Sequence, residues 1–451
     1  SKLNMPLETL QTPPIESDHV LEFQDNPEVL NRIRSQYNTP QQIRRNFKYF
    51  ITAQARIRTC HIILLISNLF TSLVGLEGVF HSIDLKCGVP CFHERLFACE
   101  DAIQWARNLK KYHIVLDSKF SLIQLSNGED YSHCLMYIST GSQYYYENSK
   151  ISFRTLLSML ISVHEKIFLE RNNMKYEANE QVNEIKWRMN SRPVIDAMLK
   201  HWEAIFIKSG GTLACHEENI PMINENPAMR LIIPLHLFAN IRKCLDLRRV
   251  MNRIWLKDWE GMNEGLSCMS SNKDSLREAS SFALNIVRFW AETVSVMKNA
   301  ERTAIRTPIF SITCIFSSIL IVAEYMRRVE AWAQDFDPSN PTAQILNASD
   351  RMFWLKSEQV LKKVEEHLLP KGYNSQSYAE FLRSQAKGAL DLNVLDNELA
   401  RRAMKPDTPT EETKEVIIKA RLSSRSLYLG VRILGDAPIW PIALLFAHAL
   451  Q

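Results

Sequence analysis

Apolar residues recur at three- and four-residue spacings over most of the chain, the pattern of helices that bury one face. One such row is Ile62, Leu65, Ile66, Leu69 and Leu73, and a later one is Ile286, Phe289, Trp290, Val294 and Met297. The alternation of apolar and polar residues that is typical of strands is scarce. The pattern therefore predicts an all-α fold, a compact multi-helix domain with no significant β-sheet.

The helical pattern begins near Asn31. Further helices are predicted near residues 150–170, 179–208, 226–258, 308–334, 342–368, 376–403, 410–434 and 438–450. Ser275 and Glu278 have the spacing of a capping box before the later apolar row. The breaks are short and no repeat has a fixed period, so we expect one helical domain over residues 29–451. Residues 1–28, polar and acidic with four prolines, are predicted to form an extended leader.

The composition is that of a large globular protein. With 451 residues, 46% of them hydrophobic, the chain can bury about three quarters of the surface that its unfolded form exposes. A net charge of +4 does not favour nucleic-acid binding, which usually accompanies a strongly basic domain. The basic run from Ile241 to Arg253 is more typical of the solvated face of an amphipathic helix than of a nucleic-acid site.

The cysteines and the apolar runs indicate an intracellular protein without a membrane partner. The nine cysteines are an odd number, several of them lie in apolar runs, and no signal peptide is present, so we expect reduced and mostly buried thiols. The apolar runs that start at His61 and Ile309 are shorter than the roughly 18 residues of a membrane span and contain polar residues. Buried core helices are the better interpretation of both runs.

The stretch CGVPCFHERLFACED, residues 87–101, looks most like chemistry. It could hold a metal ion, a Cys91–His93 nucleophile, or only a structural turn. A structural zinc site needs a second ligand pair, which is missing here, and a nucleophile needs an orienting group and an oxyanion hole that a sequence cannot show. After Pro90 the pattern predicts a helix with two apolar rows, Leu96, Cys99, Ile103 and Ala106 beside Ala98, Ala102, Trp105 and Leu109.

Other catalytic constellations are absent from the sequence. It contains no HExxH, GxSxG, DDxxD, GxGxxG or Walker-type loop, and its 13 glycines are few. His164 stands without a partner motif, and we expect it on a solvated or partly buried helix face. A helical scaffold for protein partners and a helical lyase-type enzyme stay open as alternatives. A lyase would show acidic side chains converging in a pocket, and a scaffold a long apolar surface.

The region from Arg56 to Trp105 resembles the fungal-specific transcription factor regulatory domain, also called the middle homology region. In that family an Arg-rich helix start leads into an apolar helix, a loop with an acidic residue, a Leu-Pro-Cys turn, and then an acidic residue, an aromatic residue and a Trp. The residues matching these features are Arg56 and Arg58 before the helix Cys60–Val74, Asp84, Val89, Pro90, Cys91, Glu94, Phe97, Ala98 and Trp105. The resemblance makes Cys91 part of a structural turn.

Two later stretches agree with this resemblance. Thr307 and Pro308 before a long apolar helix resemble the family's late Thr-Pro element, and Trp440 lies where the last helices of the domain carry a Trp. Two departures are Ser67 in place of a common Asp, and Glu77-Gly78 in place of Pro-Pro. The zinc finger or zinc binuclear cluster of family members has no counterpart in this sequence, so this chain by itself is not expected to read DNA.

The resemblance implies a regulatory domain of a nuclear transcription factor rather than an enzyme. Its partners would be the attached DNA-binding module and, through it, promoter DNA, with transcriptional co-regulators, a small-molecule effector or a second copy of the chain. It implies no catalytic, cofactor or metal site in this chain, and zinc only in the attached module. A helical domain can hold an effector between its helices, for instance beside Phe310 or Tyr325, although core packing explains these aromatic residues as well.

Overall fold

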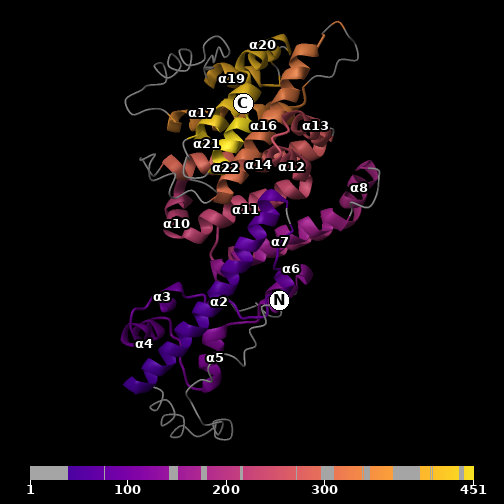
Figure 1. Cartoon of the computed structure of the whole chain (residues 1–451). Coiled ribbons are helices and arrows are strands. Elements are labelled where there is room, and N and C mark those ends of the chain that lie inside the picture. Colours follow the sequence, from indigo (N-terminus) through magenta and orange to yellow (C-terminus); the bar gives the residue numbers. More distant parts are fainter. Residues whose placement is uncertain are drawn as a thin grey trace. The chain divides into compact units, whose positions relative to one another are not determined.

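The computed structural model in Figure 1 is helical throughout its described part. It describes residues 39–75, 77–141, 151–173, 180–213, 217–270, 272–295, 309–337, 339, 346–368, 397–406, 408, 410–435 and 441–451. No strand occurs in these ranges, although an isolated antiparallel bridge joins Gly88 and Asp130. The predicted all-α fold is confirmed.

The described residues fall into two compact units by their contacts. Unit 1 contains the described residues up to Ser72 and those from 77 to 213. Unit 2 contains Leu73–Gly75 and the described residues from 217 onward. One domain over residues 29–451 stays a prediction, and the predicted leader, residues 1–28, lies outside the described residues.

Unit 1 is built around one long helix and a pair of packed helices (Figure 1). Its elements are α2 (Pro40–Val74), a 3-10 turn (Ser82–Asp84), α3 (Glu94–Phe97), α4 (Ala102–Lys111), α5 (Lys119–Asn127), α6 (Tyr131–Thr140), α7 (Phe153–Asn173), α8 (Glu180–Lys186), a π-helical turn (Trp187–Ser191) and α9 (Arg192–Lys208). Helix α9 packs against both α6 and α7.

Short polar residues start three of these helices. The Asp101 carboxylate accepts the N–H of Gln104 at 2.7 Å, and the Asp130 carboxylate accepts that of Ser132 at 2.8 Å. Ser118 forms a capping box with Ser121 at the start of α5. Such caps satisfy backbone N–H groups that the first turn leaves free, so local sequence determines where these helices begin.

The long helix α2 corrects two predictions. It runs from Pro40 to Val74, so Arg56 and Arg58 lie in its middle and do not open it. The row predicted to be buried is partly outside, since Ile62 is 46% and Ile66 52% exposed. The buried face is instead formed by Gln54, Ile57, Arg58, Cys60, His61, Leu64 and Asn68. Apolar periodicity missed this face because its polar side chains have partners inside unit 1.

The segment after Pro90 also differs from its predicted form. Two short helices, α3 and α4, replace one helix, because Asp101 caps a new start. Ile103 is 61% exposed, whereas Ala102, Trp105 and Leu109 are buried. Both predicted rows therefore pack inward in part, since Leu96 and Cys99 of the first row are also buried while Ala98 of the second is exposed.

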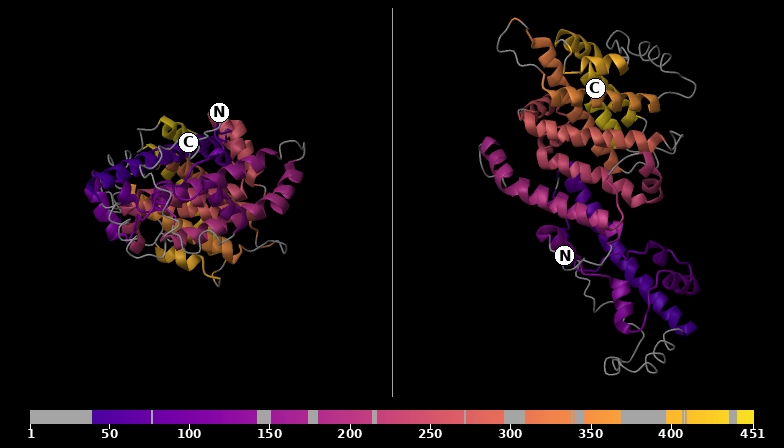
Figure 2. Two further views of the ribbon diagram at one scale, coloured as in Figure 1. Left: turned by 90° about the horizontal axis from the view of Figure 1, so that it is seen from below. Right: turned by 180° about the vertical axis from the view of Figure 1, so that it is seen from behind.

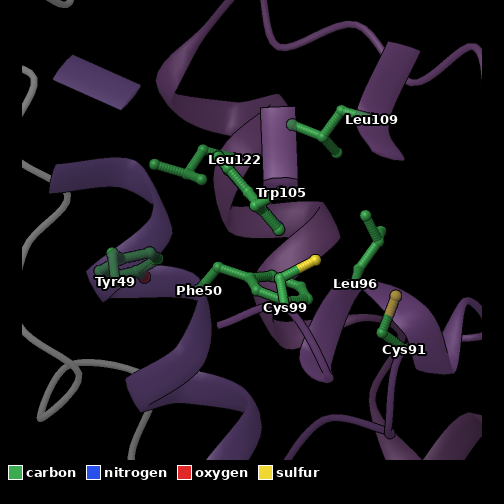
Figure 3. Packing of buried hydrophobic residues seen from close by; sticks show 8 residues of the cluster. All are labelled: Tyr49, Phe50, Cys91, Leu96, Cys99, Trp105, Leu109 and Leu122. Atoms are coloured by element: carbon green, nitrogen blue, oxygen red, sulfur yellow. The ribbon is translucent and has the colours of Figure 1, made fainter. Parts of the chain in front are cut away.

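Trp105 lies in a core cluster that joins α2 to α3, α4 and α5 (Figure 3). Its ring centroid is 5.6 Å from that of Phe50 and 5.8 Å from that of Phe47, both on α2. The cluster consists of Tyr49, Phe50, Cys91, Leu96, Cys99, Trp105, Leu109 and Leu122. Large aromatic side chains bury the most apolar surface per residue, so this cluster holds the short helices on α2.

Unit 2 contains the later helices (Figure 2). They are a 3-10 turn (Glu217–Asn219), α10 (Ile220–Glu225), α11 (Pro227–Cys244), α12 (Arg248–Trp255), α13 (Trp259–Ser270), α14 (Lys273–Ser295), α16 (Ile309–Asp335), α17 (Ala348–Leu368), α19 (Asn397–Ala403), α20 (Thr410–Ala420), α21 (Leu422–Gly435) and α22 (Pro441–Ala449). The predicted helix 226–258 is broken at Leu245, and the predicted helix 410–434 at Arg421.

Helix α16 forms the core of unit 2. It packs against α14 and α21, and it is long and apolar enough to cross a membrane by length and composition alone. Of its most apolar window, 89% is buried inside the protein, as predicted for a core helix. Gly430 lets α21 approach closely, because a Cβ there would lie 2.6 Å from Ile319 of α16.

Helix α14 begins one turn earlier than its predicted cap. The side chain of Asn272, directly before the helix, accepts the N–H of Ser275 at 3.2 Å. Ser275 itself is buried in the first turn. The predicted capping box of Ser275 and Glu278 is wrong because both residues lie inside the helix, and Asn272 caps it instead.

The described cysteines are all free thiols, as expected. Seven of these eight are buried and Cys268 is exposed, while Cys215 lies outside the described residues.

A buried charge cluster lies between α17 and α21 in unit 2. The guanidinium of Arg425 donates two hydrogen bonds to the Glu365 carboxylate and lies 3.8 Å from the Glu358 carboxylate. All three side chains are buried, and both Glu358 oxygens accept no hydrogen bond from the described residues. Burial raises the pKa of the Glu358 carboxyl, against the opposing attraction of Arg425 and Lys362.

We expect Glu358→Gln to stabilise unit 2 increasingly as the pH rises. Because the folded chain binds the Glu358 proton more tightly than the unfolded chain does, its free energy of unfolding falls as pH rises from the ordinary pKa toward the raised one. Glutamine has no carboxyl group to ionise, so the stability difference from the native chain should grow as the pH rises from the ordinary carboxyl pKa through the raised one. Urea denaturation followed by circular dichroism at a series of pH values measures this difference.

Glu366→Gln is the matched control, since Glu366 is exposed on the same helix. Its stability curve should run parallel to that of the native chain. A pH-independent difference for Glu358→Gln would contradict a buried proton at Glu358.

Candidate functional site

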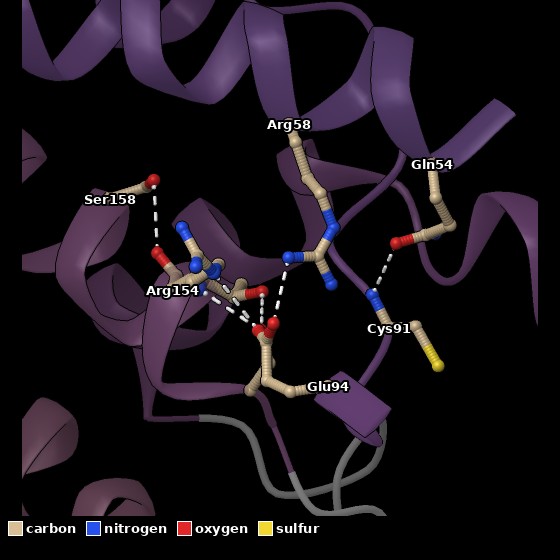
Figure 4. Close-up of polar contacts among 8 residues, drawn as sticks. Gln54, Arg58, Cys91, Glu94, Arg154 and Ser158 are labelled. Carbon is tan, nitrogen blue, oxygen red and sulfur yellow. Dashed lines mark hydrogen bonds and ion pairs between the residues drawn. The ribbon is translucent and has the colours of Figure 1, made fainter. Parts of the chain in front are cut away.

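Arg58 and Glu94, which are far apart in the sequence, meet in unit 1 (Figure 4). Arg58 projects from the middle of α2, and its Nη1 donates to Glu94 Oε2 at 2.8 Å. Glu94 is the first residue of α3, and its other oxygen accepts from Arg154 Nε of α7 at 3.1 Å. One carboxylate thus joins three helices through charge-assisted hydrogen bonds.

The Arg58 guanidinium also covers the ring of Phe97, with 4.1 Å between its central carbon and the ring centroid. The Arg58 side chain is buried, while that of Glu94 is 46% exposed. A planar guanidinium can stack on a ring and bind a carboxylate at the same time, which an ammonium does less well. The structure therefore brings together three of the predicted motif residues.

Cys91 lies in the irregular segment between the 3-10 turn and α3, residues 85–93, which we call the Cys91 segment. The Cys91 backbone N–H donates to Gln54 Oε1 at 2.8 Å, and Gln54 Nε2 donates to the Ser126 carbonyl at 2.7 Å. Gln54 is fully buried on α2. Its amide therefore ties the Cys91 segment to α2, as Figure 4 shows, and also ties the end of α5 to α2.

The Cys91 thiol is a packed side chain and not an activated nucleophile. It is buried in the core cluster with Trp105, and burial raises its pKa. The neighbouring His93 stacks on the Tyr112 ring at 4.1 Å between centroids. A raised thiol pKa lowers the thiolate fraction that attack requires. Cys91 and Pro90 are both buried in an irregular segment, and a structural turn at Cys91 stays a prediction of the resemblance.

His61 fixes the start of the Cys91 segment. Its Nε2 donates to the Gly88 carbonyl at 3.1 Å, so Nδ1 accepts from the Ser158 hydroxyl at 2.8 Å. Burial lowers the pKa of His61 to about 4, so the ring is neutral at physiological pH. The sequence analysis did not single out Gln54 or His61. The sign that could have indicated them is that both have the helical spacing of the buried residues Ile57 and Leu64.

Gly88 permits a close backbone contact between the Cys91 segment and α5. A Cβ at this position would lie 1.7 Å from the Asn127 carbonyl oxygen. Val89 donates its N–H to that same oxygen at 3.1 Å. Only glycine fits at such a distance.

The other predicted motif residues are dispersed. Asp84 ends the 3-10 turn, which Glu165 of α7 holds by accepting the N–H of Ser82 at 2.9 Å. Arg56 lies on α2 two positions before Arg58, and Trp105 lies in the core cluster. Thr307, Pro308 and Trp440 lie outside the described residues.

Two further sequence interpretations need correction. His164 is fully buried on α7 and not on a solvated or partly buried face. The basic run 241–253 is not one solvated face, because Arg242 and Lys243 are buried. Asp246 binds Arg248 at 2.6 Å and Asp258 binds Arg253 at 2.7 Å, so neighbouring acids balance part of its charge.

The part of the chain that the structure describes has no group of three or more His, Cys, Asp or Glu side chains that could hold a metal ion. The aromatic side chains considered for a cavity pack in the core of unit 2. Phe310 and Tyr325 are buried, and the Tyr325 hydroxyl donates to Asp350 and accepts from Arg277 Nε. The site is therefore a junction of helices held by hydrogen bonds and ion pairs within unit 1.

The chain is similar in sequence to two yeast proteins. Probable transcription factor TDA9 of Saccharomyces cerevisiae is 55% identical over 454 residues, and Respiration factor 2 of the same yeast is 51% identical over 459 residues. Each match covers 100% of this chain. The chain is homologous to both proteins. It spans 36% and 33% of their respective lengths.

No family model matches the chain, and no solved structure matches it.

Arg58→Ala should destabilise unit 1 by about 2–4 kcal/mol, because it removes a charge-assisted hydrogen bond, a ring contact and buried packing together. Thermal and urea unfolding of the variant measure the loss. Arg56→Ala, two positions earlier and only partly buried, is the control and should cost less than about 1 kcal/mol. Equal losses would mean that the Arg58 contacts contribute nothing specific.

Gly88→Ala should destabilise unit 1 by about 3 kcal/mol or more, since its methyl group overlaps a backbone oxygen that cannot rotate away. Hydrogen exchange of the α5 and α2 amides would report the local opening. Gly435→Ala is the control, because a Cβ there meets nothing within 4 Å. Native-like protection in Gly88→Ala would show that the Cys91 segment does not lie against Asn127.

Proposed function

We propose that this chain is the regulatory, or middle homology, domain of a fungal transcription factor that acts on transcription by RNA polymerase II. The observation that carries the proposal is the match of the whole chain, at 55% identity, to about a third of a probable transcription factor. A DNA-binding module with its zinc would then lie in another part of the polypeptide. The protein would act in the nucleus.

The geometry of the motif residues supports this proposal. In the resemblance, an Arg of the first helix, a Cys turn and a following acid are the shared features. Here Arg58 binds Glu94, and Cys91 between them is anchored to the same helix by Gln54. A contact between residues this far apart in sequence gives the motif a physical role, since it fixes the Cys91 segment on α2.

The chemistry of the described residues favours a role in control over a role in catalysis. The charged groups of unit 1 bind one another across helices, and the Cys91 thiol is buried with a raised pKa. Two compact helical units give folded surfaces on which a co-regulator, an effector or an activation segment of the same polypeptide could be held. We propose that such binding masks or releases the attached activation segments.

A reporter assay in yeast tests the proposal. The chain is fused between a heterologous DNA-binding domain and a strong activation segment, and expression is compared with that of a fusion lacking the chain. A regulatory domain should change reporter expression by about fivefold or more, the lower end of typical coupling between sites. The purified chain alone should show no sequence-specific binding to DNA.

Gly88→Ala serves as the control in this assay, because it should open unit 1 and abolish the effect. Immunoblotting ensures equal amounts of each fusion. Unchanged reporter expression with the folded native chain would contradict a regulatory role and favour a scaffold. Sequencing the transcript upstream of Ser1 tests the second part of the proposal, which requires a zinc finger or a zinc cluster there.

A further inference from the structure

The first turns of α2 and the whole of α4 form a part of unit 1 whose charged side chains are all basic. The two helices lie side by side (Figure 1), and the Phe47 ring centroid of α2 is 5.8 Å from that of Trp105 of α4. Neither helix contains an acidic residue. Six of their basic side chains are exposed, and we call them the basic patch: Arg44, Arg45, Lys48, Arg107, Lys110 and Lys111.

The charges of the basic patch have no counter-charge among the described residues. None of the six side chains forms an ion pair there, whereas Lys166 of α7 binds Glu170 at 2.6 Å. Asp101, just before α4, is engaged as the cap of that helix. Arg44 and Lys48 are four positions apart on α2, a spacing at which like charges destabilise a helix. An anionic partner would remove this repulsion.

Exposed apolar side chains accompany the basic patch. Ile103 of α4 is 61% exposed, and Val115 and Phe120, which follow α4, are 60% and 72% exposed. Helix α5, which contains Phe120, joins the same core cluster through Leu122. A nucleic acid binds a basic surface mainly through its phosphates, whereas a peptide with both acidic and apolar residues would use both features. The surface therefore favours an acidic, partly apolar peptide as its partner.

Such a peptide stands in this chain before α2. Residues 8–28, which we call the acidic segment, contain no Lys or Arg and include Leu21 and Phe23. Twelve positions separate Glu28 from Pro40, the first residue of α2, and twelve extended residues span up to about 40 Å. The segment is thus long enough to reach the basic patch. Its six acids equal the patch in number: Glu8, Glu16, Asp18, Glu22, Asp25 and Glu28.

We propose that the acidic segment docks on the basic patch of the same chain. Each exposed ion pair contributes little, so the contact depends on several pairs acting together and on the covalent tether. The tether gives the segment an effective concentration at the patch on the order of millimolar. An acidic peptide of another protein would have to displace the segment to bind there. The inference does not depend on the regulatory role, because it concerns a contact within this chain.

The test uses the whole native chain, treated with a carbodiimide that joins a carboxylate to an amine only where the two are in contact. A digest is then analysed by mass spectrometry. We expect links from the acidic segment to Lys48, Lys110 or Lys111. At about 1 M NaCl, where the screening length is about 3 Å, these links should fall at least threefold. Lys200 of α9, also exposed in unit 1, is the matched lysine and should form none.

A triple variant keeps every linking lysine and removes half of the patch charge. It combines Arg44→Gln, Arg45→Gln and Arg107→Gln, all at exposed positions, so the fold should be kept, which circular dichroism checks. Links to the patch lysines should fall at least threefold, because three of the six attractive charges are gone. The matched control should leave the links unchanged, and it combines three exposed positions outside the patch: Arg188→Gln, Arg249→Gln and Arg401→Gln.

Three results with the native chain would overturn the inference. The acidic segment would link to no patch lysine, or it would link to Lys200 as often as to the patch. In a mixture of unlabelled and 15N-labelled chains, the links would join two different chains. A fourth contrary result is a DNA duplex that the native chain retains and the triple variant does not, since the patch would then serve a nucleic acid.

Discussion

The polar backbone of the Cys91 segment must find partners outside itself, and unit 1 is organised around this requirement. The segment belongs to neither helix nor sheet, so buried N–H and C=O groups in it would cost free energy if they stayed unbonded. Gln54 and His61 supply two of the partners from α2, and Asn127 and Tyr131 supply others through their backbones. These backbone groups are bonded to protein atoms, so the loss of any one of these hydrogen bonds would lower the stability of unit 1.

The same requirement explains why α2 buries polar side chains and exposes apolar ones. Gln54, Arg58 and His61 face inward because their hydrogen bonds are inside unit 1, and Ile62 and Ile66 are left outward. Unit 2 follows the more usual rule, with α16 surrounded by apolar contacts and Gly430 allowing close approach. Unit 2 also contains a buried charge cluster, in which Arg425 binds Glu365 and lies near Glu358.

The homology to two yeast proteins and the geometry of the junction support each other in different ways. Homology connects the chain to a probable transcription factor but says nothing of how Arg58, Cys91 and Glu94 contribute. In the structure the contacts of these residues attach the Cys91 segment and the short helix α3 to α2.

The sequence by itself determined the helical class, the burial of most cysteines and the core position of α16. These features depend on periodicity, composition and short motifs, which are local. Only the tertiary structure decided which face of α2 is buried and where Arg58 finds its acid. The physical reason is that Gln54, Arg58 and His61 have hydrogen-bond partners far away in the sequence, and helical spacing contains no information about those partners.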